Sequence, residues 1–217
     1  MLTADDVASV ILERSAPWSD AMRLQKLLYY VQAWHLAVTD EPLFPEQIKA
    51  WKQGPVVPQV WHSRRDQATR SANAQHTGHI HLDEMTSNLI DLVLARYGSM
   101  SGEELSALTH VEQPWLNARG DLPPDAECRT AISTEDMAAY YRANRKLGGR
   151  TAADLAIGGV YIRGARDESV DIDAILDSFP EDDDPGEDPW GGASLESADK
   201  GDGRGIHLEP WRAYSDL

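Results

Sequence analysis

The longest regular apolar pattern in the chain runs from Met22 to Val38 and contains no glycine or proline. Positions in it recur at spacings of three and four, which places them on one side of an α-helix; they are Leu24, Leu27, Leu28, Val31, His35 and Val38. Tyr29, Tyr30 and Trp34 widen the apolar surface beyond one stripe. We therefore predict a central helix over about 20–39, covered on most sides by the other elements.

Shorter helical patterns lie on both sides of this helix. Thr3 and Asp6 form a variant capping box for a helix that ends near Glu13, and Ser19 is the predicted N-cap of the central helix. Further helices are predicted over about 56–65, 83–97, 101–109 and 134–146, with a short turn near 114–116. Gly98 fits a left-handed C-cap after the helix at 83–97. The fold class that follows is mainly α, a compact helical domain around the central helix.

The pattern is different between the central helix and the next one. Residues 42–58 have no helical period, and alternation near 47–53 predicts a short extended segment. Gly54 and Pro55 are residues typical of a turn. Pro58 must fall within the first turn of the helix that follows, because a proline farther inside would break it. Residues 66–81 are polar, and we predict a loop there.

Charge divides the chain into two predicted domains. Residues 1–150 carry 19 acidic and 15 basic residues, whereas 151–217 carry 17 acidic and five basic residues. We predict a helical domain over 1–149 and an acidic extension over 150–217 that is partly disordered or becomes ordered on a partner. Short helices at 152–157 and 171–179 and a short strand at 158–162 are predicted within the extension. From Asp167 to Asp188 there are eleven acids and no base, too little apolar surface for independent folding.

Composition also narrows the location and the class of protein. No run of 18 apolar residues exists, so we expect no membrane span. The N-terminus has acids where a signal peptide needs bases, which favours a cytoplasmic location. Cys128 is the single cysteine, so neither an internal disulfide nor a multi-cysteine metal site can form. A net charge of −16 disfavours non-specific nucleic-acid binding and favours a basic protein partner.

Three groups of residues could carry chemistry, and for each a structural interpretation is favoured. The histidines at 76, 79 and 81 could bind a transition metal, but they lie in a polar loop with no completing ligand at an obvious spacing. His110 and Glu112 could act as acid and base, but no nucleophile motif accompanies them, and hydrogen bonds between helix ends are the favoured role. A basic group could contact nucleic acid, although a solvated face is the commoner case; it comprises Arg64, Arg65 and Arg70.

Three segments taken in order resemble a known family: LQKLLYYVQAWHLA, IKAWKQGPVVPQVW and LSALTHVEQPWLNAR. They are similar to the Panacea domain of SocA-like, or phage-associated GepA-like, antitoxins, over about residues 1–146. The resemblance implies a mainly helical domain that neutralises toxins by direct contact, and one member of the family acts as a proteolytic adaptor. It implies no catalytic residue and no cofactor. Candidates for scaffold or partner-binding roles are Lys26, Tyr29, Gln32, Trp34, Trp51, Gly54, Pro55, Trp61, His110, Glu112, Trp115 and Arg119.

The leading interpretation is a non-enzymatic antitoxin that binds a cognate toxin with a basic surface. One alternative is a proteolytic adaptor that delivers this toxin to a protease. Another, from a different class, is a metal-dependent hydrolase built on the four histidines named above and Glu112, but the required ligand spacing is not visible. Autoregulation through DNA is weaker still, because no helix-turn-helix is evident and the charge is adverse.

Overall fold

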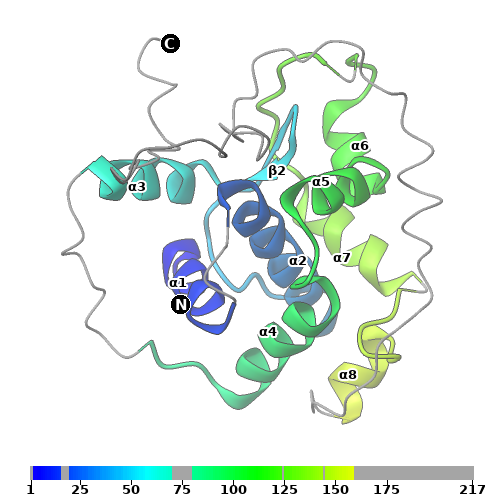
Figure 1. Cartoon of the computed structure of the whole chain (residues 1–217). Coiled ribbons are helices and arrows are strands. Elements are labelled where there is room, and N and C mark those ends of the chain that lie inside the picture. Colours follow the sequence, from blue (N-terminus) through cyan, green and yellow to red (C-terminus); the bar gives the residue numbers. More distant parts are fainter. Residues whose placement is uncertain (1, 16–19, 70–79, 124, 144, 159–217) are drawn as a thin grey trace, which may run out of the picture.

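The computed structural model describes residues 2–15, 20–69, 80–123, 125–143 and 145–158, except for the side chains of 65–69 and 158. Over these residues the protein is mainly helical, as predicted, with one small antiparallel sheet (Figure 1). The elements are α1 (Ala4–Arg14), α2 (Ala21–Thr39), β1 (Lys49–Trp51), β2 (Gly54–Val56), α3 (Pro58–Thr69), α4 (Glu84–Tyr97), α5 (Gly102–His110), α6 (Gln113–Arg119), α7 (Thr134–Arg142) and α8 (Ala152–Gly158).

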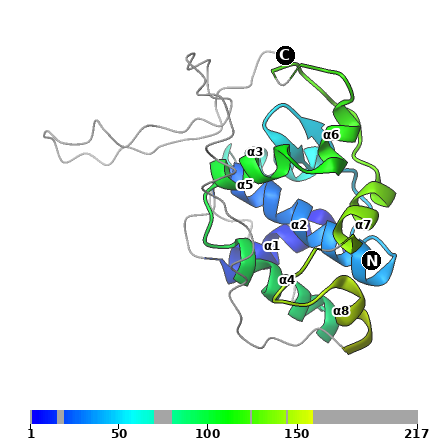
Figure 2. The same ribbon diagram turned by 90° about the vertical axis from the view of Figure 1, so that its right-hand side faces the viewer.

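Helix α2 is the centre of the molecule. Every residue from Leu24 to Ala37 is buried, so the helix is covered on all sides over this stretch. It packs against α1, α4, α5, α7, α8 and β2, and Figures 1 and 2 show these elements arranged around it. The prediction of a covered central helix is confirmed. Burial of each large apolar side chain contributes about 1.5–3 kcal/mol, so α2 is the main source of packing energy.

The ends of the helices agree with some predicted caps and correct others. The Thr3–Asp6 capping box is present at α1. At α2 the N-cap is Asp20, whose carboxylate accepts a hydrogen bond from the Arg23 N–H, and not Ser19. The left-handed residue is Asp40 at the end of α2, with φ 64°. Gly98 does not adopt this conformation: its φ is −71°, and the chain continues in a right-handed turn after α4.

The extended segment predicted near 47–53 is confirmed as β1. It pairs with β2, so Gly54 and Pro55 lie in a strand and the turn falls two positions earlier, at Lys52 and Gln53. On its other edge β1 bonds to the segment before α7: the Ala50 N–H donates to the Thr130 carbonyl, and the Ile132 N–H to the Ile48 carbonyl. A short three-stranded arrangement therefore joins the hairpin to the second half of the chain.

Two predicted boundaries were wrong. Helix α3 begins at Pro58, at a first-turn position as required, but it continues to Thr69, so 66–69 are helical rather than loop. Helix α7 ends at Arg142 instead of near Lys146. It ends there because the Arg142 guanidinium turns back onto α2, where it donates to the carbonyls of Leu36 and Ala37 at 2.8 Å. The chain then reverses through Gly148 and Gly149, both with positive φ, and buries Leu147.

The beginning of the acidic extension is packed on the helical core. The helix predicted at 152–157 is present as α8, and its Ala152 and Leu155 are buried against α2 and α7. The predictions for 159–162 and 171–179 lie outside the described residues. None of the helices described is long and apolar enough to span a bilayer.

Candidate functional site

The predicted site residues come from three distant segments, and most of them meet in the interior between α2, the β1–β2 hairpin and the α5–α6 corner. Lys26 of α2 is fully buried, and its ammonium donates to the Pro55 carbonyl of β2 at 3.4 Å. Gly54 is required at this contact. Its φ is +95°, and a Cβ there would lie 2.7 Å from Lys26 Cε and 2.8 Å from Thr109 Oγ1. Burial lowers the pKa of Lys26 to about 7, against the opposing charge of Asp20.

A second group surrounds the carboxyl of Glu112, which lies between α5 and α6. Its Oε2 accepts hydrogen bonds from the hydroxyls of Tyr29 (2.9 Å) and Tyr141 (2.8 Å), and its Oε1 accepts one from Tyr30 (3.4 Å). These tyrosines come from α2 and α7. Burial raises the pKa of Glu112 to about 7, although the three hydroxyls stabilise the charged form. The carboxyl therefore joins three helices through one buried group.

His110 and Trp115 form the third group, beside Arg119. The ring of His110 lies 4.3 Å from that of Trp115, centroid to centroid, and the Arg119 guanidinium lies 4.7 Å above the Trp115 ring. Arg119 also donates to the carbonyls of Ala50 (3.4 Å), Pro123 (2.7 Å) and Ala126 (2.8 Å). Burial lowers the pKa of His110 to about 4, and the charge of Lys26 adds to this effect, so the imidazole is neutral at pH 7.

The three groups around Lys26, Glu112 and His110, with their hydrogen-bond partners, are called the interior frame below. The remaining candidates contact this frame or lie at its edge. The Gln32 amide donates to the Phe44 carbonyl and accepts from the N–H groups of Leu43 and Phe44. The ring of Trp34 is fully buried and packs edge-on against Tyr141. Trp51 and Trp61 pack edge to face at 6.3 Å, and the Trp51 carbonyl accepts the indole N–H of Trp115.

The arrangement favours a structural role for these residues over a catalytic one. Most of their polar atoms bond to backbone groups or to each other, and most of the side chains are buried. No group of three or more His, Cys, Asp or Glu residues could hold a metal within the described ranges. His81 is exposed there, whereas His76 and His79 lie outside them. Arg64 is paired with Asp5 at 3.2 Å; the side chains of Arg65 and Arg70 lie outside the described residues.

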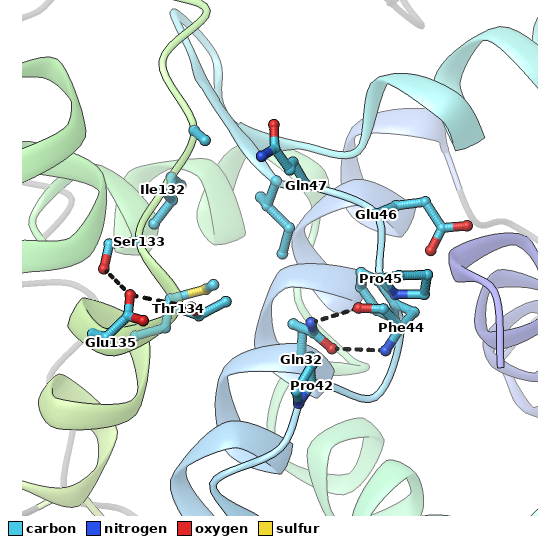
Figure 3. Close-up of a pocket in the computed structure, with 13 residues that line it drawn as sticks. Gln32, Pro42, Phe44, Pro45, Glu46, Gln47, Ile132, Ser133, Thr134 and Glu135 are labelled. Atoms are coloured by element: carbon cyan, nitrogen blue, oxygen red, sulfur yellow. Dashed lines mark hydrogen bonds between the residues drawn. The ribbon is translucent and has the colours of Figure 1, made fainter. Parts of the chain in front are cut away.

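One surface pocket, of about 270 Å³, lies beside this frame. It opens where β1 and the segment before α7 diverge, between residues 42–48 and 131–137 (Figure 3). Phe44, Ile48, Ile132 and Met137 provide a buried apolar lining. Glu135 is exposed on the α7 side, and hydrogen bonds from its own N–H and from the hydroxyls of Ser133 and Thr134 lower its pKa. The pocket therefore combines an apolar interior with an ionised carboxylate at its edge.

Comparison with protein families bears on the same segments. Residues 24–116 match the model of a family described as antitoxin SocA-like, Panacea domain. We call this matched segment the Panacea-type region. No curated protein and no solved structure matches the chain.

The Panacea-type region is shorter than the range of about 1–146 over which the resemblance was expected. It contains the central helix, the hairpin and the corner between α5 and α6, and with them eleven of the twelve candidate residues; Arg119 lies just beyond it. The partners of the frame extend past the match, since Tyr141 and the pocket wall at 131–137 belong to the following segment. The family description suggests an antitoxin and a non-enzymatic role for this region.

Several residues of the frame were not among the predicted candidates. Tyr30 and Tyr141 complete the tyrosine cluster, and the Gln25 amide oxygen accepts the Val57 N–H at 2.7 Å. A signal for Gln25 and Tyr30 was present: α2 has amide, ammonium and hydroxyl groups within an otherwise apolar stretch. Such groups are buried only with partners, so each predicts a specific contact. Tyr141 gave no comparable signal, because α7 is amphipathic and a tyrosine in such a helix does not by itself indicate a buried hydrogen bond.

Proposed function

We propose that this protein is an antitoxin that neutralises a cognate toxin by direct protein–protein binding. The observation that carries the proposal is the match of residues 24–116 to the SocA-like Panacea family. The geometry supports it in one respect: the matched residues build a buried, hydrogen-bonded interior, which leaves recognition of a partner to the residues on the surface around it. We place this activity in the cytoplasm and expect it to need no cofactor.

The pocket between 42–48 and 131–137 is the recess that we assign to a toxin side chain. Of the twelve candidates, Gln32 lines it and fixes the backbone of 43–44 that forms one wall. Its volume of about 270 Å³ is suited to one large side chain rather than a whole ligand. An apolar lining beside the Glu135 carboxylate favours a long basic side chain, whose stem packs on the lining while its charge meets the carboxylate.

The acidic extension fits the same proposal. Its charge would attract a toxin whose active surface is basic, as surfaces that bind nucleotides or RNA are, and would accelerate association. Removal of 167–217 should then weaken neutralisation at low salt. Unchanged affinity of this truncated chain at low salt would exclude a role for the extension in toxin binding.

Co-expression with the product of the adjacent gene tests the proposal. We expect that product alone to stop growth, the pair to grow, and the two proteins to purify together. A toxic neighbour that is neither bound nor neutralised would contradict the proposal. Measurement of toxin levels separates the adaptor alternative, because an adaptor lowers the level of its partner through a protease and a stoichiometric inhibitor does not.

A further inference from the structure

Helix α4, the loop between α7 and α8, and α8 lie together on one side of the molecule (Figures 1 and 2). The loop carries Arg145, Lys146 and Arg150, and mutual backbone hydrogen bonds between Leu147 and Arg150 hold it closed. It packs on α4 at Leu92, where a Cβ on Gly148 would lie 3.3 Å from Leu92 Cδ2. Arg96 is one helical turn beyond Leu92 on the same face of α4. We call these four cations the basic patch.

The groups around the basic patch leave it with an excess of positive charge. Arg145 donates to the Tyr140 hydroxyl and lies 4.5 Å above that ring, and Arg96 lies 5.5 Å above the ring of Tyr97. Burial raises the pKa of Tyr97, and the charges of both arginines oppose that rise, which places them near one ring. Bonds from Thr151 lower the pKa of Asp154, assisted by Lys146 and Arg150. Among the described residues, these cations act on two acids: Lys146 and Arg150 on Asp154, and Arg145 on the buried Glu112. Even with Arg150 left out of the balance, Arg96, Arg145 and Lys146 exceed the charge of these two carboxyls.

The same chain supplies an acidic segment within reach. The run from Asp167 to Asp188 holds eleven acids and no base. It begins nine residues after Gly158, where α8 ends, and α8 itself begins directly after the basic patch. Nine residues extend over at most about 30 Å, enough to return along a helix of two turns, which is about 10 Å long. Attachment at such a distance gives an effective concentration in the millimolar range.

We propose that the acidic run 167–188 docks on the basic patch of its own molecule, and that a toxin with a basic surface competes with the patch for the run. The docking is independent of the proposed function, whereas the competition rests on it. Docking would keep the acids near the folded domain until a more basic surface draws them away. Because the contact is between exposed charges, salt weakens it, with a screening length of about 8 Å at physiological ionic strength.

Zero-length cross-linking of the full-length protein tests the docking without any partner. Carbodiimide joins lysine amines to carboxylates in contact, and peptide mass spectrometry identifies the pairs. Lys146 lies in the basic patch, and Lys52, on the β1–β2 turn, is similarly exposed and serves as an internal control. We expect cross-links from the run to Lys146 at least roughly fivefold above those to Lys52 at low salt, decreasing at high salt. Equal yields, or yields that salt does not change, would overturn the proposal.

A pair of variants separates docking from simple proximity along the chain. Arg145→Gln removes one charge of the patch, and Arg129→Gln removes one from a similarly exposed arginine elsewhere. We expect Arg145→Gln to lower the Lys146 cross-links roughly twofold or more and Arg129→Gln to leave them unchanged. A yield that neither variant changes would mean that the tether alone produces the cross-links, and would overturn the proposal. A mixture of isotope-labelled and unlabelled protein identifies cross-links within one molecule.

Addition of the toxin tests the competition separately. We expect it to lower the Lys146 cross-links and to produce cross-links between the run and the toxin. Loss of toxin binding in Arg145→Gln, with the Lys146 cross-links unchanged, would assign the patch to the toxin and overturn the proposal. If docking fails while neutralisation persists, the proposed function stands; if docking is present and no neutralisation occurs, the proposed function fails and the docking stands.

Discussion

Glu112 shows at the level of one residue how the interior is specified. Three tyrosine hydroxyls from α2 and α7 donate to a carboxyl at the start of α6, so a single side chain determines how three helices meet. A buried carboxylate is costly unless it is hydrogen-bonded. The sequence indicated a structural hydrogen-bonding role for Glu112, but not its partners, because the three tyrosines lie up to 83 positions away.

Glu112 should make stability depend on pH in a defined direction. Its folded pKa is about 7 against an ordinary value of 4.5. Between these values the folded state holds a proton that the unfolded state has lost, so the free energy of unfolding falls as pH rises through this range. Relative to Glu112→Gln, the natural protein should lose about 3 kcal/mol between pH 4.5 and 7.

Urea denaturation of both proteins at several pH values measures this difference. The comparison with Glu112→Gln removes the contributions of other buried groups, such as Lys26 and His110, which are common to both proteins. His110 in particular acts in the opposite sense, because its folded pKa is lowered to about 4. If the free energies of unfolding of the two proteins differ by the same amount at every pH, burial does not raise the pKa of Glu112 and the prediction is wrong.

Gly54 gives a second prediction at the level of a residue. Alanine there combines a positive φ with contacts of 2.7–2.8 Å to the side chains of Lys26 and Thr109. Gly149 is the matched control, because its φ is +76° and a Cβ would meet nothing within 4 Å. Thermal or urea unfolding should show a loss of roughly 2–4 kcal/mol for Gly54→Ala and roughly 1–2 kcal/mol for Gly149→Ala. Equal losses would mean that the contact with Lys26 is not restrictive.

Among the elements, α2 was the most predictable. The period and length of α2 were visible in the sequence, and its burial followed from an apolar surface wider than one stripe. The end of α7 was not predictable, because Arg142 and Lys146 have the same local preference for a helix end. What distinguishes them is a contact across 106 positions, from Arg142 to the Leu36 carbonyl. The pocket has the same origin, since its two walls come from 42–48 and 131–137.

Arg142 should therefore stabilise the end of α2 from another element. Its guanidinium donates to the carbonyls of Leu36 and Ala37, and it contacts Asp40 at 2.5 Å. Lysine cannot reproduce this planar set of donors. We expect urea denaturation to show a loss of roughly 1–3 kcal/mol for Arg142→Ala and little recovery in Arg142→Lys. Full stability of the lysine variant would show that charge alone is sufficient.

The pocket can be tested at the level of the elements that form it. Glu135→Arg reverses the charge at its edge, and Glu103→Arg makes the same change on an exposed position of α5. We expect Glu135→Arg to weaken toxin binding roughly tenfold or more, measured by calorimetry, and Glu103→Arg to have little effect. Unfolding of each variant provides the control for stability. Equal weakening by both variants would indicate general charge attraction rather than a specific recess.

At the scale of the whole molecule, the described residues form a helical interior around α2, and most of the net negative charge lies later in the sequence. The match to the Panacea family covers most of the interior frame, while charge is concentrated after residue 150. Composition predicts a division near residue 150, because charge is a sum over residues and needs no contact information. Composition could not predict that α8, beyond this boundary, packs on α2 and α7. We expect surface residues to determine which toxin is recognised, and a single sequence has no regular pattern that identifies those residues.

Titration of the purified toxin with this protein, in a reaction free of protease, tests the central claim most directly. We predict that toxin activity disappears at a stoichiometric ratio, with the toxin intact and held in a complex. Full activity at excess of this protein, or inhibition that appears only when a protease is added, would contradict neutralisation by direct binding.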